Sequence, residues 1–361
     1  MTIGDYKIHT KFKLNGVSYS KSELKDLGYD LVKEGSLYET AIGEFLSEWL
    51  DDKSFVEVQT SGSTGKPKTI VLQKQQMVNS AQATGSYFNL KSSNSALLCL
   101  PAEYIAGKMM LVRAMILGLE LDYVEPSSSP LLKVSKNYDF AAMVPLQLEN
   151  SIKQIERIRT LIIGGAAISN SLKDKLQTQS TKIFETYGMT ETITHIAVKK
   201  VNHIPNETEN CFKALANVVF SKDDRDCLVI SASRVSNAPV ITNDIVDLIS
   251  ETEFEWLGRY DNVLNSGGIK LFPEQIEAKL GSHIVNRFFV VGIPDEKLGE
   301  KLVLIVENEI DARRVVQELK DSPFFNNFEI PKQVYVVDKF VLTDNGKIRR
   351  AETLKLIENK Q

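Results

Sequence analysis

Residues 60–68 of the chain read Thr-Ser-Gly-Ser-Thr-Gly-Lys-Pro-Lys, and residues 69–72, Thr-Ile-Val-Leu, follow directly. The nine residues hold two glycines, four hydroxyls and two lysines. Such a composition suits a phosphate-binding loop, because glycine lets the backbone approach the ligand while hydroxyls, N–H groups and lysines contact its oxygens. The apolar residues that follow predict a strand. A solvated polar turn is the alternative interpretation.

Familiar phosphate and nucleophile motifs do not fit this stretch. A Walker loop places Ser or Thr after its Gly-Lys pair and opens a helix, whereas Pro67 follows Lys66 and a strand is predicted next. The chain lacks the glycine spacing of a Rossmann dinucleotide site and the Gly-x-Ser-x-Gly elbow of a serine hydrolase. These three enzyme classes are therefore excluded.

Around the loop, residues 55–198 alternate short apolar runs with helical stretches. The apolar runs are 97–100, 119–124, 140–144, 161–163 and 182–184, and the helical stretches include 107–117, 146–157 and 170–176. This alternation predicts an α/β fold with a largely parallel sheet.

The residues before the loop predict a hairpin and two helices. Asn15-Gly16 lies between alternating apolar positions, as in a hairpin turn. Ser20 and Ser36 are each followed three residues later by Glu, which predicts two capping boxes. After the second box, apolar residues at 38, 42, 45, 46 and 49 form one helical stripe that we expect in the core.

After residue 258 the pattern changes to a small α+β unit. A helix is predicted at 273–277, with Pro at its first turn, and another near 311–319; strands are predicted at 287–291, 302–306 and 334–337. We expect two domains, residues 1–258, with a short first subdomain at 1–54, and residues 259–361.

Charge and cysteine content bound the function. The chain has 361 residues, 43 basic and 47 acidic, which argues against nucleic-acid binding. Its three cysteines form no CxxC pair, so neither a disulfide framework nor a zinc site is expected. No signal region and no apolar run long enough to span a bilayer occurs, which predicts a cytoplasmic protein.

The loop, with a strand on each side, resembles the signature of the acyl-adenylate-forming enzymes, which include acyl- and aryl-CoA ligases, luciferases and peptide-synthetase adenylation domains. Three further segments resemble this family's motifs in the family's order. They are Tyr-Gly-Met-Thr-Glu at 187–191, Gly-Arg-Tyr-Asp at 258–261 with its following Gly-Gly and Pro-Glu-Gln-Ile-Glu, and Asn-Gly-Lys-Ile-Arg-Arg at 345–350. The resemblance implies a large N-terminal adenylating domain of layered mixed sheets and helices, and a small mobile C-terminal α+β domain.

The resemblance also implies the reaction. A small-molecule carboxylic acid would attack the α-phosphate of ATP, with Mg²⁺ bound, to give an acyl-adenylate and release pyrophosphate. Coenzyme A would then displace AMP from the acyl-adenylate. A homodimer is a further possibility. An adenylate-binding module that has lost activity is the non-enzymatic alternative, and the retained Lys68, Glu191 and Lys347 argue against it.

Site residues carry over by motif position. The resemblance implies that Lys347, Thr190 and Glu191 are catalytic, with Glu191 also holding the metal, that Asp261 is the hinge residue, and that Gly267 and Gly268 lie toward coenzyme A. The residues implied to bind ATP or AMP are Thr60, Ser61, Gly62, Ser63, Thr64, Gly65, Lys68, Gly164, Gly165, Ala166, Tyr187, Gly188, Asp244 and Arg259. Tyr187 would lie against adenine and Asp244 would bind the ribose hydroxyls. Asn243 replaces the usual glycine before that acid, and asparagine tolerates a left-handed backbone.

The acid is implied by a closer resemblance to the compact o-succinylbenzoate–CoA ligases of menaquinone biosynthesis. Residues 100–107, Leu-Pro-Ala-Glu-Tyr-Ile-Ala-Gly, resemble a segment of theirs, with Tyr104 in place of the usual His, and residues 190–195 resemble another. The implied substrate carries a second carboxylate, for which Lys108 and Arg113 are the candidate cations, and Thr194 and His195 are expected to line the same pocket. Two alternatives stay open: both cations face solvent, and the enzyme activates another aryl or fatty acid.

Overall fold

The computed structural model describes residues 8–60, 68–204, 210–281, 283–342 and 348–358. The predicted site residues Ser61, Gly62, Ser63, Thr64, Gly65 and Lys347 lie outside the described residues. Of Thr60 and Lys68 only the backbone is described, at the ends of the paired strands β2 (Phe55–Thr60) and β3 (Lys68–Gln73). The strand expected after the loop is therefore confirmed.

A twelve-stranded sheet organises most of the described chain, in the order β1-β5-β4-β6-β7-β8-β9-β10-β14-β13-β12-β11. Its first half is parallel and consists of β1 (Lys13–Leu14), β5 (Glu120–Tyr123), β4 (Ser95–Leu98), β6 (Tyr138–Met143), β7 (Ile158–Ile163) and β8 (Lys182–Gly188). The predicted α/β class with a largely parallel sheet is confirmed for this half.

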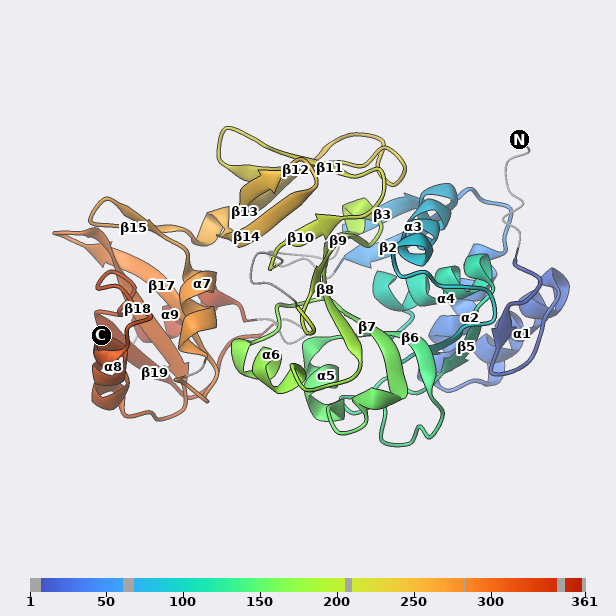
Figure 1. The fold of residues 1–361 in the computed structure, drawn as a ribbon, viewed down its shortest axis with the longest axis horizontal. Helices are drawn as coiled ribbons and strands as arrows, with labels where there is room; N and C mark the ends of the chain where they lie inside the picture. Colours follow the sequence, from blue (N-terminus) through green and yellow to red (C-terminus); the bar gives the residue numbers. More distant parts are fainter. Residues whose placement is uncertain (1–7, 61–67, 205–209, 282, 343–347, 359–361) are drawn as a thin grey trace.

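Helices cover both faces of the parallel half (Figure 1). One face packs against α1 (Lys21–Glu34), α2 (Leu37–Trp49), α3 (Lys74–Tyr87) and α4 (Ile105–Leu117), and the other against α5 (Pro145–Ser151) and α6 (Asn170–Leu176). Neighbouring residues of a strand belong to different cores, as Leu97 and Leu98 show, because successive side chains point to opposite faces. Both strand faces are buried, which explains the continuous apolar runs of the sequence.

The second half of the sheet is antiparallel. It continues through β9 (His195–Lys200), β10 (Phe212–Ala214), β14 (Glu253–Arg259), β13 (Val240–Ser250), β12 (Cys227–Ser231) and β11 (Val219–Lys222). The ring of Phe254 stacks on that of Phe212, with ring centroids 5.3 Å apart, and meets the ring of Phe220 edge to face.

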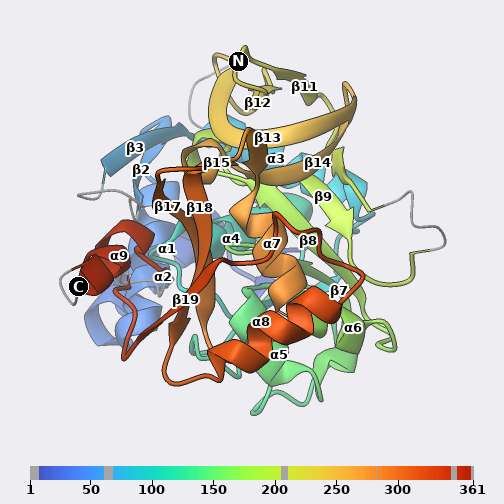
Figure 2. The ribbon, with the colours of Figure 1, turned by 90° about the vertical axis from the view of Figure 1, so that its left-hand side faces the viewer.

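The C-terminal residues form a separate five-stranded sheet. Its strands are β15 (Leu264–Ser266), β16 (Ile269–Leu271), β17 (Phe288–Asp295), β18 (Gly299–Glu307) and β19 (Gln333–Val337). Helices α7 (Pro273–Leu280) and α8 (Ala312–Asp321) pack on one face and α9 (Arg350–Glu358) on the other (Figure 2). Its cores are separate from those of the large sheet, which supports the division into 1–258 and 259–361 that we continue to propose.

Two local predictions differ from the structure. The helix expected at 146–157 is divided into α5 and a 3-10 turn (Ile155–Arg157), because the chain must turn back to enter β7. The hairpin at Asn15-Gly16 is reduced to a single bridge between Leu14 and Val17, and β1 instead becomes the edge strand of the large sheet by pairing with β5. Both capping boxes form as predicted, and residues 42, 45, 46 and 49 of the expected stripe are buried.

Candidate active site

The predicted nucleotide residues gather at the carboxyl edge of the parallel half of the sheet. Gly164 and Gly165 follow the end of β7, and Thr190 and Glu191 follow the end of β8 in a 3-10 turn (Thr190–Thr192). Carboxyl ends of parallel strands share one edge, and ligands of open α/β sheets bind there. Two motifs that are distant in sequence therefore reach one edge.

Tyr187 and Asp244 are in direct contact. The Tyr187 hydroxyl donates to the Asp244 carboxylate over 2.6 Å, and the Trp256 indole N–H donates to its other oxygen over 3.2 Å. The Arg259 guanidinium lies 3.7 Å from the same carboxylate. Asp244 is only 5% exposed, and burial together with the Asp244 charge raises the pKa of Tyr187. Three residues predicted separately for the nucleotide thus form one cluster.

The turn expected at Asn243 is not needed. Asn243 lies inside β13, and it is not among the described residues with positive φ. Its side-chain amide donates to the Asp261 carboxylate over 3.2 Å, which connects β13 to the predicted hinge residue. Asp261 also lies 3.8 Å from Arg259, in the 3-10 turn (Tyr260–Asn262) that leads to the C-terminal sheet.

Gly188 is required by its surroundings. A Cβ atom there would lie 2.3 Å from the carbonyl oxygen of Thr194 and 2.5 Å from the Cα of His195, because Gly188 pairs with His195 between β8 and β9. Ile193, buried in the connection, has a φ of +67°, a conformation that β-branched residues rarely adopt. The segment that carries Thr190 and Glu191 is therefore held tightly and under backbone strain.

The other small-residue positions differ in their surroundings. A Cβ on Gly164 would lie 2.8 Å from the Thr186 hydroxyl. Gly165, which has a φ of +85°, and Ala166 are exposed, as is the predicted metal-binding residue Glu191. Gly267 and Gly268 form the turn between β15 and β16, with φ values of +61° and +83°. Nothing lies within 4 Å of a Cβ built on Gly268, so its glycine is required by the turn rather than by packing.

Arg113 is buried without a counter-charge. Its side chain is 1% exposed, and no carboxylate among the described residues lies within the 4.0 Å of an ion pair. Its nitrogens contact the hydroxyls of Thr84 and Thr194, each over 3.4 Å, and Nδ1 of His195 over 3.4 Å. Burial lowers the pKa of Arg113 to about 9. The alternative that it faces solvent is wrong.

The contacts of His195 define its tautomer. The Thr84 hydroxyl donates its proton to the Ser80 carbonyl over 3.0 Å, so Nε2 of His195, 3.2 Å from that hydroxyl, carries a proton and donates. Nδ1 then accepts from Arg113. Burial and the charge of Arg113 hold the pKa of His195 well below its usual 6.5, so the ring is neutral.

Lys108 and Tyr104 have different surroundings. Lys108 is 8% exposed, its ammonium lies 3.7 Å from the Glu48 carboxylate and 4.8 Å from the ring centre of Phe45, and burial lowers its pKa. The alternative that it faces solvent is wrong as well. Tyr104, immediately before α4, is 47% exposed.

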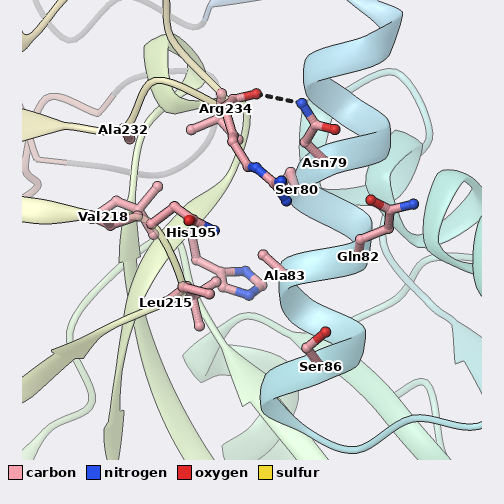
Figure 3. Close-up of a pocket in the computed structure, with 14 residues that line it drawn as sticks. Asn79, Ser80, Gln82, Ala83, Ser86, His195, Leu215, Val218, Ala232 and Arg234 are labelled. Atoms are coloured by element: carbon pink, nitrogen blue, oxygen red, sulfur yellow. Dashed lines mark hydrogen bonds between the residues drawn. The ribbon is translucent and has the colours of Figure 1, made fainter.

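A pocket of about 320 Å³ opens between α3 and the antiparallel half of the sheet (Figure 3). Its walls are Asn79, Ser80, Gln82, Ala83 and Ser86 from α3, His195 and Ile196 from β9, and Leu215, Ala216, Asn217, Val218, Ala232, Arg234 and Val235 from later segments. Three polar lining residues lie outside α3, namely His195, Asn217 and Arg234. The sequence predicted a role only for His195, because nothing in the sequence indicates that residues 217 and 234 lie beside α3.

The described residues offer neither a cluster of metal ligands nor a membrane-spanning helix. No group of three or more His, Cys, Asp or Glu there could hold a metal ion. Magnesium bound through one carboxylate and substrate phosphates needs no such group, and the exposed Glu191 fits that mode. No described helix is long and apolar enough to cross a membrane.

Comparisons with known proteins identify the family of the chain. Residues 46–220 match the family of AMP-binding enzymes. The chain is 36% identical to a crystallised acyl-CoA synthetase (AMP-forming)/AMP-acid ligase II-like protein from Dyadobacter fermentans, covering 92% of this chain and 98% of that one, with a TM-score of 0.60. The chain belongs to the AMP-binding enzyme family.

More distant relatives carry a narrower name. A 2-succinylbenzoate–CoA ligase from Listeria monocytogenes is 27% identical over 93% of this chain and 74% of its own length. The o-succinylbenzoate CoA synthetase of Bacillus subtilis, solved with its acyl-adenylate, is 21% identical, covers 82% of this chain and 68% of its own, and has a TM-score of 0.72. This last likeness confirms the fold.

Proposed function

We propose that the protein is an AMP-forming acid–CoA ligase that activates o-succinylbenzoate, a step of menaquinone biosynthesis. The observation that carries the proposal is the contact of Tyr187 with Asp244 beside the Thr190–Glu191 turn, in a chain of the AMP-binding family. The relatives named 2-succinylbenzoate–CoA ligase support the identity of the acid.

The nucleotide would lie along the carboxyl edge. The Asp244 carboxylate, already oriented by Tyr187 and Trp256, would accept hydrogen bonds from the ribose hydroxyls, and Arg259 would contact ribose or phosphate. Gly164, Gly165 and Ala166 would flank adenine. Because these groups are held before the ligand arrives, binding would cost little reorganisation.

The two half-reactions divide the remaining roles. Thr190 would bind the α-phosphate and Glu191 would hold Mg²⁺, which neutralises phosphate charge when bound. Lys347 and residues 60–68 would stabilise the negative charge that develops as the acid carboxylate attacks. For the thioester step, Gly267 and Gly268 would lie toward coenzyme A, with rotation at Asp261.

The acid would bind near Tyr104, Lys108, Arg113, Thr194 and His195. Arg113 supports an anionic substrate, because a buried guanidinium without a carboxylate produces a positive potential in its surroundings. We further propose that the reaction takes place in the cytoplasm, where ATP and coenzyme A are available, and that the protein is a homodimer, which light scattering in solution would test.

The test is a panel of acids in a pyrophosphate-release assay, run with and without coenzyme A. We expect o-succinylbenzoate to give release that depends on the acid, and a thioester only when coenzyme A is present. Strong turnover of a simple fatty acid or another aryl acid, with none of o-succinylbenzoate, would overturn the proposed substrate while leaving the ligase class in place.

A further inference from the structure

Neither cation predicted for the second carboxylate is available to it, because Lys108 is paired with Glu48 and Arg113 is fully buried. Lys108 has the Glu48 carboxylate within 3.7 Å. Arg113 is 1% exposed, and its contacts hold His195 and two threonine hydroxyls. A carboxylate of the substrate could reach either only by displacing side chains that are already hydrogen bonded.

Arg234 is available instead. It is exposed at the pocket between α3 and β9, and its guanidinium has no carboxylate within the 4.0 Å of an ion pair in the described chain. Figure 3 shows its side chain extending from its loop toward Ser80, into the same space as the His195 ring. A planar guanidinium binds a carboxylate through two parallel hydrogen bonds.

The backbone of Arg234 is fixed in place. Asn79 of α3 donates to the Arg234 carbonyl over 2.8 Å, as Figure 3 shows, and Gln76 donates to the Asn237 side chain over 2.9 Å. The first bond joins residues 155 positions apart in the sequence, and the second joins residues 161 positions apart. They hold the loop against α3 while leaving the guanidinium free for a ligand.

The pocket lining defines the chemistry of an occupant. Ile196, Leu215, Val218 and Val235 supply apolar surface, amides and hydroxyls supply hydrogen bonds, and no Asp or Glu is among the lining residues. A volume of about 320 Å³ is at the small end of ligand pockets. An occupant of this description is a small apolar or aromatic molecule with an anionic group.

The pocket is connected to the predicted catalytic turn through one strand pairing. His195, on its wall, pairs with Gly188, and Gly188 is followed within three residues by Thr190 and Glu191. Arg113 and Thr84 hold the His195 ring in one tautomer, so this wall is rigid. A molecule bound here would contact His195, whose strand partner Gly188 lies two residues before Thr190.

We propose that Arg234 is a specificity-determining residue that binds the second carboxylate of the acid substrate in this pocket. The inference rests on the proposed function and makes it more specific, since it selects diacids over monoacids. Arg113 is then a positioning residue, which acts through His195 rather than on the substrate.

The experiment compares Arg234→Gln with wild type on three acids. They are o-succinylbenzoate and its two monoacids, 4-oxo-4-phenylbutanoate and 2-butanoylbenzoate, each of which keeps one carboxylate. The monoacid that is adenylated is the reference. We expect Arg234→Gln to raise KM for the diacid about 10- to 100-fold, the size expected for lost charge-assisted hydrogen bonds, and to leave KM for the reference and for ATP unchanged.

Two further variants control for indirect effects. Arg159→Gln removes an exposed arginine of β7 and should change nothing. Ala83→Phe fills the pocket and should raise KM for the diacid and the reference monoacid alike. Unchanged diacid KM in Arg234→Gln, or an equal rise for the monoacid, would overturn the assignment.

Calorimetric binding of o-succinylbenzoate separates this inference from the proposed function. Binding to wild type that Arg234→Gln weakens at least tenfold supports the site even where no pyrophosphate is released, an outcome that would overturn the proposed reaction alone. Absence of diacid binding to wild type would overturn both.

Discussion

Asp244 provides the sharpest test of the nucleotide site, through replacement by Ala and by Asn. The carboxylate accepts hydrogen bonds from Tyr187 and Trp256 while only 5% exposed. Alanine removes the shared acceptor of two half-buried donors, at about 0.5–1.5 kcal/mol for each hydrogen bond, so we expect the free energy of unfolding to fall by about 1–3 kcal/mol. Asparagine keeps one acceptor oxygen, and we expect about half that loss.

The effect on the nucleotide is measured separately from stability. If Asp244 binds the ribose hydroxyls, Asp244→Asn removes a charged acceptor and raises KM for ATP about 10- to 100-fold, with a smaller effect on KM for the acid. Urea unfolding and pyrophosphate-release kinetics give the two quantities. Asp247→Asn, an exposed position on the same strand, is the matched control. A KM for ATP within twofold of wild type in Asp244→Asn would refute the reasoning.

Three other predictions concern the catalytic lysine, the tight turn and pH. Lys347→Ala should slow adenylation about 10²–10³-fold in pyrophosphate exchange, as for the loss of one charge-stabilising donor, and near-normal exchange would contradict its role. Gly188→Ala should cost about 1–3 kcal/mol of stability by overpacking against Thr194, measured by thermal unfolding, whereas Gly281→Ala, with its nearest atoms at 3.6 Å, should be tolerated. His195 stays neutral in the folded protein but gains a proton in the unfolded chain below about pH 6.5. Because the unfolded chain then binds more protons, the free energy of unfolding decreases as the pH is lowered. Relative to His195→Gln, wild type should lose up to about 1.4 kcal/mol per pH unit below 6.5, and an equal difference in unfolding free energy between the two proteins at pH 5.5 and 7.5 would contradict this.

Much of the fold could be predicted because local patterns agree with the tertiary structure. The capping boxes at Ser20 and Ser36 are local, and the continuous apolar runs of β4, β6 and β7 reflect strands buried on both faces. The break after Ser151 and the parallel pairing of β1 could not be predicted, because both depend on where the neighbouring strand lies.

The site was predictable as a set of motifs but not as a geometry. The motifs indicated Tyr187 and Asp244 separately, and nothing in the sequence showed that they share a hydrogen bond across 57 residues. The sequence left open whether Lys108 and Arg113 face the substrate or solvent, whereas both are buried because this helix is covered on nearly every side. Arg234 belongs to no motif and reaches the pocket only through contacts with α3.

The most direct test of the central claim is acid-dependent exchange of labelled pyrophosphate into ATP in the absence of coenzyme A. A carboxylate that forms an acyl-adenylate reversibly makes this exchange possible, and the account predicts it with o-succinylbenzoate and its loss in Lys347→Ala. Cleavage of ATP to ADP and phosphate, or an absence of exchange with every acid of the panel, would contradict the account.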